Sequence, residues 1–144
     1  MVWLHAWPAP RQCGRRVEPS HLCPVVGLYF HIPFCHRACT YCDFHFSTSL
    51  RTKEPVLAAM RKELRDRMGE LAGAPLATIY FGGGTPSLLS PQELGFLLHD
   101  VRTMAAVEPD AEITLEANPD DVSAAAIEAW RSIGITRVSL GCGG

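Results

Sequence analysis

The sequence has no apolar run near the roughly 18 residues that a transmembrane helix needs, so no membrane-spanning segment is predicted. Charge is also scarce: charged residues make up 19% of the 144 residues, and the net charge is −2. This balance provides no bulk attraction to nucleic acid or to an anionic membrane. The apolar start, MVWLHAWPAP, has two prolines and no basic segment before it, which makes it a poor secretion signal. We expect a cytoplasmic protein with no nucleic-acid partner.

Cysteine is used sparingly, and its spacing argues against a disulfide framework. Three of the six cysteines are isolated along the chain. The other three, Cys35, Cys39 and Cys42, form a C-x3-C-x2-C triplet. Disulfides between residues this close would be strained, whereas such spacing is typical of metal or redox sites. The pattern therefore favours a reducing compartment.

After the start of the chain, the sequence alternates between predicted strands and helices. Residues 1–24 contain four prolines and no clear periodicity, and we expect a loose leader. Ser90, Pro91 and Glu93 have the pattern of a helix N-cap with a capping box. Strands are predicted over 25–32, 76–81, 112–116 and 137–140, and helices over 52–71, 90–106 and from Asp121 or Ser123 to 133.

This alternation predicts an α/β fold with a parallel sheet and right-handed crossovers. Three loops of unusual composition each follow a strand: 33–46, 82–87 and 117–120. Ligand sites of such folds lie at the carboxyl ends of the strands. We therefore expect these three loops to meet at one edge of the sheet.

The cysteine triplet is compatible with two kinds of metal site. Three thiolates can hold three irons of a cubane cluster and leave the fourth iron open for a ligand. A structural zinc site would need a fourth protein ligand, which His31, His36 or His45 could supply. Both alternatives remain open from this motif.

Two further segments are candidates for ligand contact. The run Gly82-Gly83-Gly84-Thr85-Pro86 would expose backbone groups to a ligand, or it could be a flexible turn. It has neither the lysine of a P-loop nor the spacing of a dinucleotide fingerprint. Glu116 closes the third predicted strand, where its carboxylate could accept hydrogen bonds from hydroxyl or ammonium groups, or could simply be solvated.

Taken together and in this order, four segments resemble the radical S-adenosylmethionine superfamily. Within it they are most similar to the oxygen-independent coproporphyrinogen III oxidase group and the related heme chaperones. The resemblance implies that residues 25–144 are the N-terminal part of a partial (β/α)6 barrel, with about three and a half βα units. The matching segments are LYFHIPFCHRACTYCDF, IYFGGGTPSLLSP, ITLEANPDDVS and GITRVSLG.

The resemblance also implies roles for individual residues. A [4Fe–4S] cluster would be held by Cys35, Cys39 and Cys42. An electron donor protein would be a partner, and no side chain of this chain is expected to be catalytic, because the chemistry is that of the cofactor. The residues expected to contact S-adenosylmethionine are Tyr29, Tyr41, Gly83, Gly84, Thr85 and Glu116.

Two departures from the family pattern bear on the activity. Oxidases of the group have a further cysteine two positions after the third, where this chain has Phe44. Phe44 is typical of the heme-chaperone branch, so we expect a chaperone-like protein that binds heme, with oxidative decarboxylation of coproporphyrinogen III as the alternative. The family pattern continues beyond Gly141 with more of the barrel and an expected heme-binding segment, whereas here Cys142-Gly143-Gly144 follows. We expect an incomplete chain that holds a cluster weakly.

Overall fold

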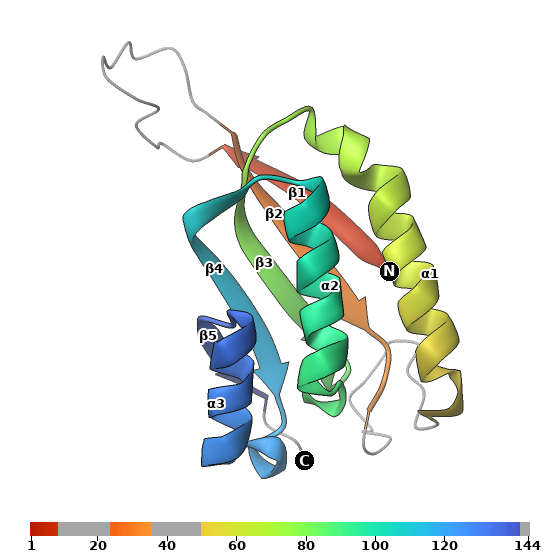
Figure 1. Cartoon of the computed structure of the whole chain (residues 1–144), viewed down its shortest axis with the longest axis vertical. Helices are drawn as coiled ribbons and strands as arrows, with labels where there is room; N and C mark the ends of the chain where they lie inside the picture. The colour runs from red at the N-terminus through yellow and green to blue at the C-terminus, as the bar shows by residue number, and fades with distance from the viewer. Residues whose placement is uncertain (9–23, 36–49, 142–144) are drawn as a thin grey trace.

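A computed structural model describes residues 1–8, 24–35 and 50–141 of the chain (Figure 1). The described residues form one five-stranded sheet, three α-helices and four short 3-10 turns. The strands are β1 (Val2–Pro8), β2 (Pro24–Ile32), β3 (Leu76–Gly83), β4 (Val107–Ala117) and β5 (Arg137–Leu140). The helices are α1 (Lys53–Arg67), α2 (Pro91–Met104) and α3 (Ala124–Ile133).

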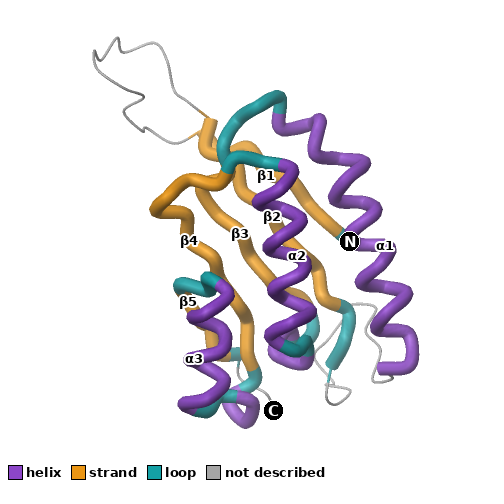
Figure 2. The backbone as a smooth tube through the Cα atoms, viewed as in Figure 1, coloured by secondary structure: helices purple, strands orange, loops and turns teal. Residues whose placement is uncertain are grey.

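The strands lie in chain order, β1-β2-β3-β4-β5. Strands β2 to β5 are parallel, and β1 runs antiparallel to β2. All three helices cover the same face of the sheet (Figures 1 and 2). Right-handed crossovers that always return on one face are what a (β/α) barrel requires. The predicted α/β class is therefore confirmed.

The hydrophobic core lies between the sheet and its helices. Phe30 of β2 and Phe81 of β3 are fully buried and stack with ring centroids 4.9 Å apart. Leu64 of α1 and Leu98 of α2 are also fully buried in the same cluster. Because alternate residues of a strand point to opposite faces, this layer takes every second residue of the strands.

The opposite face of the sheet, here called the open face, is aromatic and polar. Among the described residues no helix lies on it (Figure 2). Its side chains are only partly buried on β2, whereas Thr114 of β4 is 1% exposed. The residues of β2, β3 and β4 on this face are Gly27, Tyr29, His31, Thr78, Tyr80, Gly82, Glu112, Thr114 and Glu116.

The helix boundaries confirm the predicted capping signals and refine one of them. Ser90 caps α2 by accepting a hydrogen bond from the Glu93 N–H, and the Ser90 N–H donates to Glu93 Oε2, which completes the capping box. Of the two candidates for the third helix, Ser123 is the cap. Gly134 ends that helix in the left-handed conformation, with φ of 101°.

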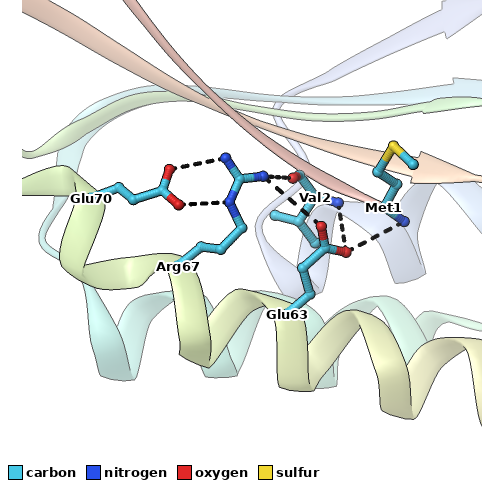
Figure 3. Close-up of polar contacts among 5 residues, drawn as sticks. All are labelled: Met1, Val2, Glu63, Arg67 and Glu70. Atoms are coloured by element: carbon cyan, nitrogen blue, oxygen red, sulfur yellow. Dashed lines mark hydrogen bonds and ion pairs between the residues drawn. The ribbon is translucent and has the colours of Figure 1, made fainter.

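The first strand is where the structure differs most from the sequence prediction. Val2–Pro8, expected to belong to a loose leader, form β1 and pair with β2. Figure 3 shows how α1 holds this strand: the Val2 N–H donates to Glu63 Oε2 at 3.1 Å, and Arg67 donates to the Val2 carbonyl. Glu70 fixes Arg67 through two hydrogen bonds of 2.9 Å. These partners are remote in sequence, which is why periodicity did not predict the strand. Residues 9–23 lie outside the described residues.

The remaining elements differ from prediction mainly in length. Strand β3 continues through Gly82 and Gly83, so two of the three glycines belong to the strand. Strand β4 begins at Val107, five residues before its predicted start. In the part of the chain that the structure describes, no helix has the length and apolar character needed to cross a bilayer.

Candidate cofactor site

The glycine loop after β3 packs directly on the start of the cysteine loop after β2. The Gly84 N–H donates to the Ile32 carbonyl at 2.7 Å, and the Thr85 N–H donates to the Phe34 carbonyl at 2.6 Å. A Cβ on Gly84 would lie 2.4 Å from the Phe34 carbonyl oxygen and 2.9 Å from Cys35 Sγ. Only glycine fits here, because real Cβ atoms do not approach other atoms so closely.

The two preceding glycines are also required by their surroundings. Gly83 has φ of 107°, and a Cβ there would lie 2.8 Å from the His31 ring. A Cβ on Gly82 would lie 2.7 Å from the Tyr80 ring. The run is therefore a fixed strand end crowded by side chains and backbone, and the alternative of a flexible turn is not what the structure shows.

Glu116, at the end of β4, is the polar centre of this edge. Its Oε1 accepts a hydrogen bond from the Tyr80 hydroxyl at 2.6 Å, and its Oε2 accepts one from the Gly83 N–H at 3.2 Å. The carboxylate thus joins the ends of β3 and β4, rather than being a simple solvated strand end. Sequence reasoning missed Tyr80, although its position two residues before Gly82 places it on the same face.

Burial and Glu116 together set the protonation of the tyrosines. Burial, followed by the hydrogen bond to Glu116, raises the pKa of Tyr80 to about 12. Burial and the nearby Glu116 carboxylate also raise the pKa of Tyr29. Both phenols are therefore neutral hydrogen-bond donors at neutral pH. Burial and the charge of the amino terminus lower the pKa of His31, although Glu116 acts in the opposite direction. The lowered pKa favours the neutral imidazole.

The loop after β4 is fixed to the loop after β3. Ser87 donates a hydrogen bond to Asp121 Oδ2 at 2.6 Å and accepts one from the Asn118 N–H at 3.1 Å. Neither Ser87 nor Asp121 was singled out from the sequence as a contact between loops. As expected, the loops after β3 and β4 meet the described start of the loop after β2, residues 33–35, at the carboxyl edge of the sheet.

Part of the predicted site lies outside the described residues. Cys39, Cys42 and Tyr41 fall in 36–49, as do His36, Phe44 and His45. Cys35 is half-buried next to Gly84. Within 1–8, 24–35 and 50–141, no three metal-binding side chains are gathered together. The cysteine ligand set therefore stays a prediction, and so does the alternative of zinc, which needs the same cysteines with His31 of β2, His36 or His45 as a fourth ligand.

What the structure does show is a cradle that fits the expected cofactor. Glycines 82–84 carry no side chain at the point where Cys35 Sγ, Glu116 and the tyrosines surround them. A thiol and a carboxylate brought to one strand edge by a run of glycines form a donor set suited to a cluster with an amino-acid-like ligand.

Comparison with known proteins identifies relatives of this chain. The profile of the Radical SAM superfamily matches residues 29–142. The "Heme chaperone HemW" of Mycobacterium tuberculosis H37Rv is 41% identical over 133 residues, covering 87% of this chain and 34% of the relative. The same-named protein of Escherichia coli K12 is 40% identical over 121 residues, covering 82% and 32%.

An oxidase is also among the relatives. The "Oxygen-independent coproporphyrinogen III oxidase" of Bradyrhizobium diazoefficiens is 35% identical over 120 residues, covering 80% of this chain and 26% of the relative. The solved structure of coproporphyrinogen III oxidase (HemN) from Escherichia coli, described as a radical SAM enzyme, matches with a TM-score of 0.71 at 30% identity, over 78% of this chain and 26% of that one. The chain spans about a third or less of the length of these relatives.

Proposed function

Since this chain belongs to the radical SAM superfamily, we propose that it binds a [4Fe–4S] cluster and S-adenosylmethionine at the carboxyl edge of its sheet. The observation that carries the proposal is the contact between the glycine loop and the cysteine loop, with Gly84 against Cys35. In this proposal Cys35, Cys39 and Cys42 are the cluster ligands. When bound, the cluster and S-adenosylmethionine supply one-electron radical chemistry.

The residues of the chain would then bind and orient the cofactor. Gly83, Gly84 and Thr85 would border its methionine end, because this strand end lies between Cys35, which contacts Gly84, and Glu116, which accepts from the Gly83 N–H. Glu116 has carboxylate lone pairs beyond the two contacts it makes, so it can accept a hydrogen bond from an ammonium or a hydroxyl group. Tyr29 and Tyr41 would contact the cofactor, and Tyr29 and Tyr80 would be neutral phenols beside the Glu116 carboxylate.

For the complete protein we propose a heme-chaperone-like role, with heme as ligand, an electron donor protein as partner and a cytoplasmic location. Relatives whose names say heme chaperone support it at 40% and 41% identity. Phe44, at the position of a further cysteine in the oxidases of the group, supports it as well. The second candidate is oxidative decarboxylation of coproporphyrinogen III, which the similarity to an oxidase structure favours.

Anaerobic reconstitution of the 144-residue chain with iron and sulfide tests the cluster. We expect about four irons and four sulfides per chain, with an electron paramagnetic resonance spectrum that changes when S-adenosylmethionine is added. Substitution of Cys35, Cys39 or Cys42 by serine should abolish binding, whereas Cys13→Ser should not. Absence of a cluster in the unsubstituted chain would refute the proposal, and a stable zinc ion in its place would support the structural-metal alternative.

The two activities are separated by one pair of assays on the reconstituted chain. A shifted Soret band on titration with hemin would support the chaperone-like role. Anaerobic formation of protoporphyrinogen from coproporphyrinogen III would instead support the oxidase. The second result would show that Phe44 is compatible with decarboxylation.

A further inference from the structure

Strand β1 lies outside the region matched by the superfamily profile, which begins at residue 29. It adds a strand to the edge of the sheet opposite β5. Val2 of this strand is fully buried, whereas Trp3 is 46% exposed. Since neighbouring residues of a strand point to opposite faces, Trp3 is on the open face, together with the site.

Trp3 extends a row of aromatic side chains across three strands. Trp3 is paired with Tyr29 across β1 and β2, and Tyr29 is paired with Tyr80 across β2 and β3. The rings of Tyr29 and Tyr80 stack with centroids 5.7 Å apart and planes inclined by 24°. We call Trp3, Tyr29 and Tyr80 the aromatic row. Two strand spacings of roughly 4.8 Å make the row about 10 Å wide.

Each end of the row is held in place by polar contacts. Tyr80 is fixed by its hydrogen bond to Glu116. At the other end, β1 is held by Glu63 and Arg67 (Figure 3), and the His31 N–H donates to the Met1 carbonyl at 2.9 Å. A surface fixed in this way loses little conformational freedom when a ligand binds.

We propose that the aromatic row is a contact surface for the flat ring of a tetrapyrrole, and that Trp3 is the part of it contributed by this chain's own first strand. This inference rests on the proposed function, from which the ligand class is taken. A ligand that touches Trp3 and Tyr80 together must span the whole row, which suits a macrocycle better than a single purine. Because the rings of Tyr29 and Tyr80 stack on each other, the row presents ring edges, and aromatic edges pack against the face of such a ring without needing an ion pair.

The test is fluorescence titration of the 144-residue chain with iron-free protoporphyrin IX, a probe that cannot be ligated through iron by cysteine or histidine. We expect Trp3→Ala to weaken binding roughly three- to tenfold, the range for loss of one stacked ring. Trp3→Phe should restore most of the affinity, and Trp3→Leu, which keeps apolar bulk without a ring, should not. The matched control is Phe96→Ala, because Phe96 is 60% exposed on α2, which covers the other face of the sheet.

Unchanged affinity in both Trp3→Ala and Trp3→Leu would overturn the inference, and the second variant serves if the first fails to fold by circular dichroism. A Trp3→Ala chain that loses affinity for S-adenosylhomocysteine but keeps its affinity for the porphyrin would also overturn the inference, because the row would then contact the cofactor. If the cluster assembles but Trp3 has no effect, only this inference fails. If the unsubstituted chain binds no porphyrin at all, this inference fails whatever the cluster result, whereas the heme-related role, which is proposed for the complete protein with its expected further heme-binding segment, does not fall with it.

Discussion

At the scale of single residues, the tightest fit of the site is at Gly84. Its position between Phe34 and Cys35 leaves no space for a methyl group. The same is true of the two glycines before it, since a Cβ would meet the Tyr80 ring at Gly82 and the His31 ring at Gly83. The absence of side chains at these positions therefore determines how closely the first cysteine can approach the loop after β3.

Gly84→Ala should separate the two loops. We expect a loss of about 1–3 kcal/mol in the free energy of unfolding, because the new Cβ must displace backbone, and lower cluster occupancy on reconstitution. Gly69→Ala is the matched control, since a Cβ at Gly69 meets nothing within 4 Å. Urea unfolding and iron analysis of both variants give the comparison. Equal stability of the two would contradict the model of the loop contact.

The Tyr80–Glu116 hydrogen bond predicts an alkaline change in stability. The pKa of Tyr80 is about 12 in the fold and about 10 in an unfolded chain. The folded state therefore keeps a proton that the unfolded state loses, and this contribution is complete below pH 10 and is lost as the pH rises to about 12.

Glu116→Gln should lower the pKa of Tyr80 without returning it to that of a free phenol, because burial, the larger cause, remains. Ultraviolet titration of tyrosinate measures the shift, with Tyr80→Phe identifying which absorbance change belongs to Tyr80. Tyr29, whose pKa is also raised, would remain in that variant. An unshifted titration in Glu116→Gln would argue that the hydrogen bond does not persist in solution.

At the scale of elements, helices α1 and α2 are joined by two ion pairs. Arg61 donates two hydrogen bonds to Asp100, at 2.5 and 3.0 Å, and Asp100 is only 7% exposed. Near the other end, Lys53 donates to Glu93 at 3.0 Å, so the capping-box glutamate also joins the helices. The two ion pairs therefore fix the position of α1 relative to α2 on the sheet.

Asp100→Ala should cost about 1–2 kcal/mol, less than a fully buried pair because Arg61 stays partly solvated. The hydrogen bonds from Arg61 lower the pKa of Asp100, so this stability is present above the pKa of the unfolded chain and is lost as the pH falls through the lower folded value. Asp66→Ala, which removes an exposed pair with Lys62, should change stability by less than about 0.5 kcal/mol. Urea unfolding at neutral and acidic pH compares them.

Prediction from sequence worked best where the signal was local. Apolar periodicity and the Ser90 capping box require only neighbouring residues, and the parallel strands and helices were found within a few residues of their ends. Strand β1 was missed because its stability depends on Glu63 and Arg67, some 60 residues away. The order of apolar and polar residues within Val2–Pro8 contains no information about these distant partners.

The site divides in the same way. The glycine run and Glu116 were predicted from their composition and position, and the structure brings them together. Tyr80 was missed because an aromatic residue in a strand is usually a packing residue, and only the register across β3 and β4 places its hydroxyl on Glu116. Ser87 was missed because a serine between two elements carries no signal of a partner in another loop.

At the scale of the whole molecule, the sheet has unequal edges. One edge is formed by β1, which is held by α1, and the other by β5, which pairs with β4. Beside β5 lies a hollow of about 330 Å³ whose lining includes the apolar residues Ile127, Trp130, Ile135 and Val138 and the charged residues Arg131 and Arg137. Ile127 is 49% exposed, and Leu140, at the end of β5 outside the hollow, is 59% exposed. Exposed strand edges next to apolar surface favour association between chains.

We expect the chain to self-associate through this side. Ile127→Lys should raise the monomer fraction in sedimentation velocity at micromolar concentration, because a charge in the apolar contact opposes its burial. Phe96→Lys, at an exposed apolar residue away from the hollow, should leave the distribution unchanged. Equal effects of the two substitutions would indicate general surface hydrophobicity instead of a contact at β5.

The direction of β1 has a practical consequence for handling the protein. Because β1 is antiparallel to β2, Met1 lies beside His31, which pairs across β2 and β3 with Gly82, the first glycine of the run. An affinity tag or fluorophore fused ahead of Met1 would therefore emerge next to the cofactor edge and compete for its space. Labels intended to leave cluster assembly undisturbed should be attached instead at Gly69, between α1 and β3, where a side chain would meet nothing within 4 Å.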